Sequence, residues 1–242
     1  MLIGEPQRTP GDLFFSIFGI PVRVHPFFWL VAAVLGLSGD SEPIGVFIWV
    51  GVVFFSILIH ELGHAFAARA RGAQPWITLY GMGGLTSFSR VRESVGGNIA
   101  VTFAGPAAGF LVTALVLASL LLFDQRIFFV PSLFPFQYGP GFENPYANFL
   151  VANLLFVNFF WGLVNLLPVY PLDGGQIARE LLVWAKPSRG IMWSLGLSMA
   201  AAVGVAVLAF MNGLYFAAIL FGYLGYSSMA TMQAYQGRGG PR

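Results

Sequence analysis

The chain has 242 residues, of which 57% are hydrophobic and only 9% are charged. An ordinary soluble domain has about a quarter of its residues charged. The low charged fraction and the mean hydropathy of +0.76 together exclude such a domain. The absence of cysteine excludes disulfides and thiolate metal sites, and a net charge of +2 gives no support to a nucleic-acid partner. Composition therefore predicts an integral membrane protein whose surroundings are the lipid bilayer.

Residues 1–23 are predicted to form a retained N-terminal segment at the membrane interface. The first residues are polar, and no small-residue cleavage pattern follows the first apolar run, so a signal peptide is not expected. The apolar stretch from Leu13 to Val22 contains Gly19 and Pro21, which disfavour a helix. We expect this stretch to lie at the interface or to form a strand.

Six apolar segments follow as candidates for membrane-spanning helices, since a bilayer crossing needs about 20 apolar residues. They comprise residues 24–39, 45–68, 98–123, 147–170, 190–210 and 213–232. No internal repeat and no long polar linker separates them. The sequence thus predicts an all-α polytopic membrane protein with a single domain over residues 1–242.

The distribution of positive charge predicts the orientation of these segments. When six spans alternate from a cytoplasmic N-terminus, 11 of the 12 Lys and Arg residues fall inside, and Arg126 alone falls outside. This asymmetry follows the positive-inside rule, and removing one span would break it. We therefore expect a multi-pass protein of the plasma (inner) membrane with both termini in the cytoplasm.

The second segment contains His60, Glu61 and His64. Histidines at positions i and i+4 share one helical face and can bind zinc, and an adjacent glutamate can act on the metal's water. His60 lies about 13 Å along the helix from Arg69, which marks the cytoplasmic edge. Because ionisable groups at this depth normally mark function, we favour a catalytic zinc site over a structural polar cluster.

Elimination indicates the third zinc ligand. Catalytic zinc usually has three protein ligands, and the remaining histidine, His25, lies at the start of the first span. The other carboxylates fall on the far side of the membrane, in the polar N-terminus or beside arginines. Asp173 therefore remains as the ligand. Its alternative role is the N-cap of a helix that starts near Gln176.

The end of the fourth segment poses a geometric problem. Pro168 and Pro171 terminate the helix, and two glycines after Asp173 allow a tight turn. A straight span from residue 147 would place Asp173 near the cytoplasmic edge, not about 10 Å inside. The span must begin deep, tilt or break early.

These motifs resemble the site-2 protease family of intramembrane metalloproteases. His60-Glu61-Leu62-Gly63-His64 is followed about 110 residues later by Leu172-Asp173-Gly174. The resemblance extends over nearly the whole chain, through Gly81-Met82-Gly83-Gly84-Leu85, Ala104-Gly105-Pro106 and the stretch from Asn165 to Asp173. It is to a compact form of the family, without a PDZ-like or nucleotide-sensing domain.

The resemblance implies one zinc ion per chain, bound by His60, His64 and Asp173. It implies that Glu61 is catalytic and that Asn165 holds the substrate or stabilises the oxyanion. The expected function is zinc-dependent hydrolysis of peptide bonds in transmembrane protein substrates, that is, regulated intramembrane proteolysis. The alternatives are a zinc-binding membrane scaffold without protease activity and an ion transporter, although a transporter often shows repeated halves.

The glycine-rich segment at residues 74–92 is predicted to be a re-entrant hairpin or loop after the second span. An unwound substrate strand could add to the edge of such a hairpin, and the alternative is an ordinary cytoplasmic loop. We expect regulation of access to come from the core or from a regulatory membrane partner. The sequence leaves the oligomeric state open.

Overall fold

The computed structural model describes residues 5–37, 42–89, 94–129 and 135–238. The chain groups into two compact units. The first comprises Met1–Arg92 with Ala104–Gly162, and the second comprises Glu93–Phe103 with Leu163–Arg242. Some charges used for the orientation lie outside the described residues: Asp40, Arg90, Arg92 and Arg242. The single domain expected for residues 1–242 stays a prediction.

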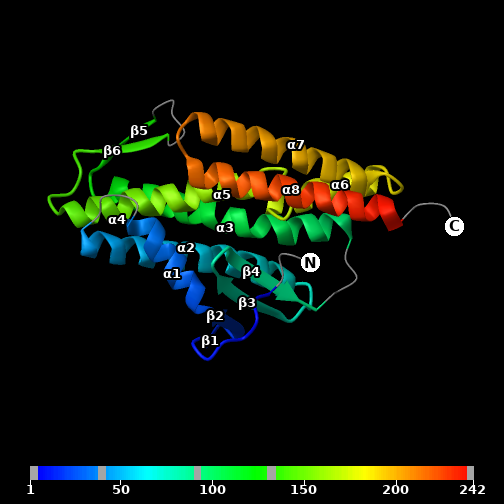
Figure 1. Cartoon of the computed structure of the whole chain (residues 1–242). Helices are drawn as coiled ribbons and strands as arrows, with labels where there is room; N and C mark the ends of the chain where they lie inside the picture. Colours follow the sequence, from blue (N-terminus) through cyan, green and yellow to red (C-terminus); the bar gives the residue numbers. More distant parts are fainter. Residues whose placement is uncertain (1–4, 38–41, 90–93, 130–134, 239–242) are drawn as a thin grey trace. The chain divides into compact units, whose positions relative to one another are not determined.

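The first unit contains a four-stranded sheet in the order β1-β2-β3-β4 (Figure 1). Its strands are β1 (Leu13–Ile17), β2 (Ile20–Val24), β3 (Pro75–Tyr80) and β4 (Gly83–Phe88). Strands β1 and β2 pair antiparallel, β2 and β3 pair parallel, and β3 and β4 form an antiparallel hairpin. The apolar stretch after residue 12 thus forms strands, and the hairpin expected after the second span is present.

The sheet packs against helix α2 (Pro43–Arg69) and the shorter helix α1 (Pro26–Leu37). Alternate residues of β2 and β3, among them Val22, Ile77 and Leu79, are fully buried against this pair of helices. On α2 the apolar residues Leu58, Leu62 and Ala65 recur at helical spacing and contact the sheet. This packing fixes the rotation of α2 about its axis.

The remaining helices follow the expected segments with shifted ends. They are α3 (Val95–Leu122), α4 (Pro145–Leu155), the π-helix η1 (Phe156–Phe160), α5 (Trp161–Asn165), α6 (Asp173–Ala185), α7 (Gly190–Met211) and α8 (Tyr215–Arg238). A second hairpin of β5 (Arg126–Phe129) and β6 (Phe136–Gly139) precedes α4. The two sheets correct the all-α expectation, since only one hairpin was foreseen. The chain remains mostly helical.

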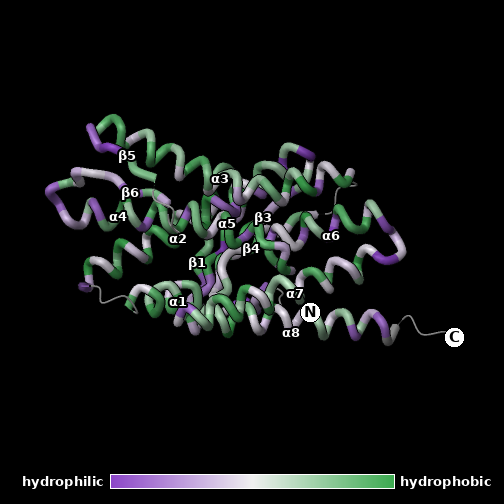
Figure 2. Tube along the Cα trace, turned by 90° about the horizontal axis from the view of Figure 1, so that it is seen from above, coloured by the Kyte–Doolittle hydropathy of each residue, from purple (hydrophilic) through white to green (hydrophobic). Residues whose placement is uncertain are grey.

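Four helical stretches are long and apolar enough to cross a membrane: α2, α3, the continuous stretch Pro145–Asn165, and α7. Helix α1 has 12 residues and is too short for a straight crossing. Helix α8 has 24 residues, but its tyrosines and serines lower its hydropathy. In Figure 2 the hydrophilic residues gather mainly at loops and helix ends. The structure thus supports at least four of the six expected spans.

The N-terminal segment is clamped to the sheet by Arg23, whose guanidinium is buried. Its Nε donates to Asp12 at 2.7 Å, and its Nη2 donates to the carbonyl of Gln7 at 2.6 Å. Thr9 donates to the same Asp12 carboxylate through its amide and its hydroxyl. Burial works to raise the pKa of Asp12, but these hydrogen bonds outweigh it and lower the pKa from 3.8 to about 2.

We expect Asp12→Asn to destabilise the protein at neutral pH. The folded-state pKa of Asp12 lies below its unfolded value, so its stabilisation is complete above about pH 4 and is lost as the pH falls toward 2. Thermal unfolding in detergent between pH 2 and 7 measures this. The melting temperatures of wild type and variant should converge at the acid end, while the exposed-site control Glu143→Gln should follow wild type throughout. A constant difference at all pH values would contradict the clamp.

Candidate metal centre

The polar face of α2 is separate from the face that packs on the sheet. Ser56, His60 and His64 are spaced by four residues and share one stripe of the helix, and all three are buried. Glu61 is also buried, at 5% exposure, beside this stripe. An apolar helix therefore buries three ionisable side chains, those of His60, Glu61 and His64. Their burial costs free energy unless the side chains have partners.

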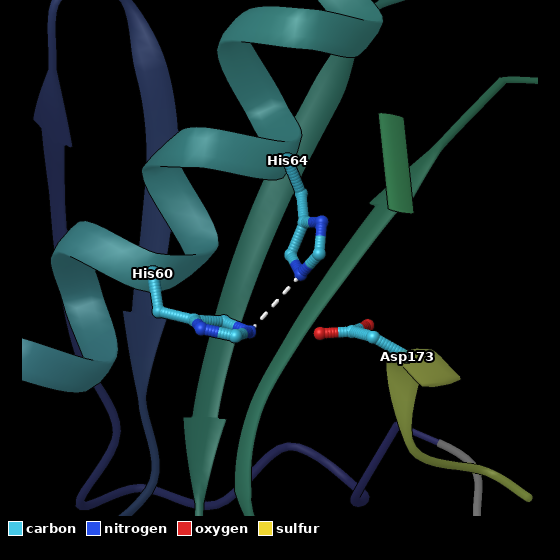
Figure 3. Close-up of side chains that lie close together, drawn as sticks. All are labelled: His60, His64 and Asp173. Carbon is cyan, nitrogen blue, oxygen red and sulfur yellow. Dashed lines mark hydrogen bonds between the residues drawn. The ribbon is translucent and has the colours of Figure 1, made fainter. Parts of the chain in front are cut away.

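The two imidazoles point at a common position. The Nε2 atoms of His60 and His64 are 3.1 Å apart, as the dashed line in Figure 3 marks. Two nitrogens bonded to one tetrahedral zinc ion at roughly 2.0–2.1 Å lie about 3.3 Å apart. The observed spacing is close to that value. The pair is arranged as two ligands of one ion would be.

Helix α3 closes over the imidazoles at Gly105. A Cβ on Gly105 would overlap the His64 ring and would lie 2.7 Å from the His60 Nε2 atom. Directly before it, the carbonyl of Ala104 occupies the space that a side chain on Gly63 would need. The glycines at these two positions let α2 and α3 approach closely. Small residues such as Gly105 favour close helix contact in a membrane, but the sequence did not indicate that the histidines are its neighbours.

Glu61 is held from the sheet side by β4. Thr86 donates its hydroxyl to Glu61 Oε2 at 2.6 Å and lies 3.0 Å from the backbone carbonyl of the same residue. A Cβ on Gly84 would overlap the Glu61 carboxylate, so the strand passes directly beside it. The hairpin thus fixes one carboxylate oxygen of Glu61. Thr86 and Gly84 belong to the site, although no sequence pattern assigned them a role in it.

In the second unit, Asp173 is the first residue of α6 and is buried. Leu172 takes the N-cap position, so the alternative role of Asp173 as an N-cap is wrong. A Cβ on Gly174 would overlap the carbonyl of Leu166, and one on Gly175 would overlap the backbone of Val169 and Tyr170. The chain after α5 therefore folds back on itself. The glycines are needed because this return brings backbone against backbone.

The return also settles how the fourth span ends. The helix stops at Asn165 instead of residue 170. If the helix had continued, Gly174 would lie about two turns beyond Leu166 along the axis, whereas in the structure it lies directly beside Leu166. Of the three expected solutions, an early break is the one observed. A hydroxyl bridge anchors the turn: Ser198 of α7 accepts from the Tyr170 amide at 2.7 Å and bonds Ser228 of α8 at 2.8 Å.

The two histidines and Asp173 each offer one buried ligand atom, and these atoms lie within 4.8 Å of one another (Figure 3). Two neutral imidazoles and one carboxylate form a donor set that suits catalytic zinc, with a fourth position for water or substrate. This group is a candidate zinc site. His25 is not in this group; its Nδ1 accepts from the Phe27 amide at the start of α1.

Asn165, the remaining predicted site residue, ends α5 and is buried at 9% exposure. It belongs to the second unit, eight residues before Asp173 in the chain. A catalytic role for Asn165 stays a prediction.

Comparison with known proteins gives a consistent result. The family model described as peptidase family M50 matches residues 139–211, which include Asn165 and Asp173. The zinc metalloprotease MJ0392 of Methanocaldococcus jannaschii is 28% identical over 217 residues, covering 87% of this chain and 58% of the relative. The chain therefore spans less than two thirds of that relative's length.

The fold is similar to that of a solved structure, the site-2 protease from Methanocaldococcus jannaschii. The TM-score is 0.60 at 20% sequence identity, and the likeness covers 91% of this chain and 95% of the other. At this identity the likeness concerns the fold alone. Residues 139–211 thus match peptidase family M50, the chain is similar to a zinc metalloprotease over most of its length, and its fold is similar to that of a site-2 protease.

Proposed function

We propose that the chain is an intramembrane zinc peptidase that hydrolyses peptide bonds of transmembrane protein substrates. The observation that carries this proposal is the buried group of His60, Glu61 and His64 on a helix apolar enough to span a bilayer. The histidines supply metal ligands, and Glu61 supplies a proton acceptor next to them. A scaffold that merely bound zinc would need no carboxylate held in place by Thr86.

In this proposal one zinc ion per chain is held by His60, His64 and Asp173. Bound there, zinc would polarise the peptide carbonyl and make water a stronger nucleophile at neutral pH. Glu61 takes a proton from the attacking water and passes it to the leaving amine. The Thr86 hydroxyl keeps one Glu61 oxygen in place, which leaves the other free to face the water. Asn165 donates a hydrogen bond to the developing oxyanion or holds the substrate backbone.

Strand β4 is the proposed docking edge for the substrate. It is the outermost strand of its sheet, and its Thr86 contacts Glu61. A transmembrane helix must unwind before hydrolysis, and its freed backbone groups need partners in a medium without water. An extended substrate segment that adds to β4 gains those partners and passes beside Glu61. In this proposal the β3–β4 hairpin re-enters the membrane.

The proposed topology has six spans, with α1 and α8 joining the four clear ones. Both termini lie in the cytoplasm of a plasma (inner) membrane protein, and the end of α2 at Arg69 faces that compartment. Access is regulated by the core or by a membrane partner.

Glu61→Gln should abolish cleavage and leave zinc binding intact, because the amide keeps the shape but cannot take a proton. Loss of a general base reduces the rate by about 10²–10⁴-fold. The assay is cleavage of a synthetic transmembrane peptide of leucine and alanine with a central Gly-Ser pair, in liposomes, together with zinc content. Glu143→Gln, at an exposed site, is the control. Unchanged cleavage by the Glu61 variant would refute the proposed mechanism.

Removing a ligand should remove the metal. Protein zinc sites bind the ion with a free energy of about 10–16 kcal/mol, to which each of the few ligands contributes a large part. His64→Ala or Asp173→Ala should therefore weaken zinc binding by roughly 100-fold or more. Metal analysis after dialysis measures this, and a chelator should inactivate wild type reversibly. Glu180→Ala, on the same helix as Asp173, is the matched control and should keep its zinc. Full zinc retention in the Asp173 variant would exclude it as the third ligand.

Gly105→Ala should weaken zinc binding although it adds a single methyl group. The added Cβ would overlap the imidazoles, and overpacking of this kind costs about 1–3 kcal/mol, or roughly five- to 150-fold in affinity. Gly51→Ala on α2 is the matched control, since a Cβ added there would have no neighbouring atom within 4 Å. Alanine favours helix, so this control should be neutral or stabilising. Equal zinc binding by both variants would contradict the tight contact.

A further inference from the structure

The π-helix η1 carries a polar residue into the interior of the first unit. Asn158 lies in the middle of η1 and is buried at 3% exposure. Its Nδ2 atom donates to the Ser56 hydroxyl of α2 and to the Leu154 carbonyl, both at 2.9 Å. A π-helical turn holds one extra residue and is often found at functional sites.

The orientation of the Asn158 amide follows from these partners. A carbonyl can only accept, so the nitrogen must face Leu154 and the oxygen must face the other way. Within the described part of the chain, Asn158 Oδ1 is a buried side-chain acceptor with no hydrogen-bond partner. Burying an unpaired acceptor costs free energy, so its retention calls for an explanation.

Asn158 lies close to the metal face of α2. Its partner Ser56 precedes His60 by four residues on the same stripe, which is about 6 Å along the helix. Helix α3 also approaches here, because a Cβ on Gly109 would lie 3.0 Å from the backbone carbonyl oxygen of Asn158. The side-chain amide is therefore held against α2 by Ser56, and the backbone of Asn158 packs against α3. Along α2, Ser56 lies on the side of His60 that is away from Arg69.

We propose that Asn158 Oδ1 accepts a hydrogen bond from a main-chain N–H of the unwound substrate. This inference rests on the proposed peptidase function and adds a substrate-binding residue to it. An unwound segment in a membrane carries main-chain N–H groups that need hydrogen-bond acceptors. Asn158 Oδ1 is an acceptor that is also buried in an apolar interior. Since extended chains advance about 3.3 Å per residue, a 6 Å offset places the donor one or two residues from the scissile bond.

An ester scan of the substrate tests this contact directly. Replacing one main-chain amide of the leucine-alanine peptide by an ester removes a single N–H donor and leaves the side chains unchanged. With wild-type enzyme, an ester at one position one or two residues from the scissile bond should lower kcat/KM by about tenfold. With Asn158→Leu, the all-amide peptide should already be cleaved about tenfold more slowly, and the same ester should cause no further loss.

Two controls separate substrate binding from structural damage. Ser56→Ala removes one partner of Nδ2 and leaves Oδ1 in place, because Leu154 still holds the amide, so the ester effect should persist. Zinc content of Asn158→Leu should equal that of wild type. A variant that lost its zinc would be replaced by Asn158→Ala, which also lacks the acceptor and should also abolish the ester effect.

The outcomes distinguish the sources of the donor. Loss of the ester effect in Asn158→Leu alone supports a substrate N–H as the donor. If every ester acts equally on wild type and Asn158→Leu, the amide binds water or serves packing only, and the inference is wrong. If wild type with zinc does not cleave the all-amide peptide, the proposed function fails, and the inference fails with it.

Discussion

The close approach of α3 to α2 is the contact on which the metal centre depends. Gly63 has no room for a side chain because the Ala104 carbonyl lies there, and Gly105 has none because the imidazoles lie there. In lipid, helices gain little from hydrophobic association, so small residues and dense packing must hold them together. Here the same contact restricts two histidine rotamers to the orientation that zinc requires. A change that pushes α2 and α3 apart would therefore also change the orientation of the two imidazoles.

Irregular backbone occurs where the site needs it. A regular helix through residue 170 would have carried Asp173 out toward the membrane edge, but the break after Asn165 returns Gly174 to the level of Leu166. The exposed amide that this break leaves at Tyr170 is satisfied by Ser198, which is itself bonded to Ser228. Membrane interiors tolerate such breaks only where the freed groups find protein partners.

Much of the site could be predicted because its signals are local. The spacing of His60 and His64 fixes a shared helical face, and Asp173 followed by elimination in a chain of few charged residues. The role of Thr86 could not be predicted, because it depends on the register that sets Thr86 opposite Ile77 and on the depth at which the hairpin meets α2. The strands before residue 24 pair partly with β3, some 55 residues away, which no local pattern reveals. Prolines indicated that the fourth helix ends but not that it ends at Asn165, before the first of them.

The two carboxylates differ in their surroundings, and the difference matches the proposed division of labour. Asp173 is the first residue of α6, where the positive end of the helix dipole favours a negative charge, as a permanent metal ligand requires. Glu61 lies in the middle of α2, far from either helix end, and is held by a neutral hydroxyl from Thr86. A group that must take up and release a proton in each cycle cannot be locked in its charged form. The neutral hydroxyl beside Glu61 therefore suits a general base, whereas the helix N-terminus at Asp173 suits a ligand that stays charged.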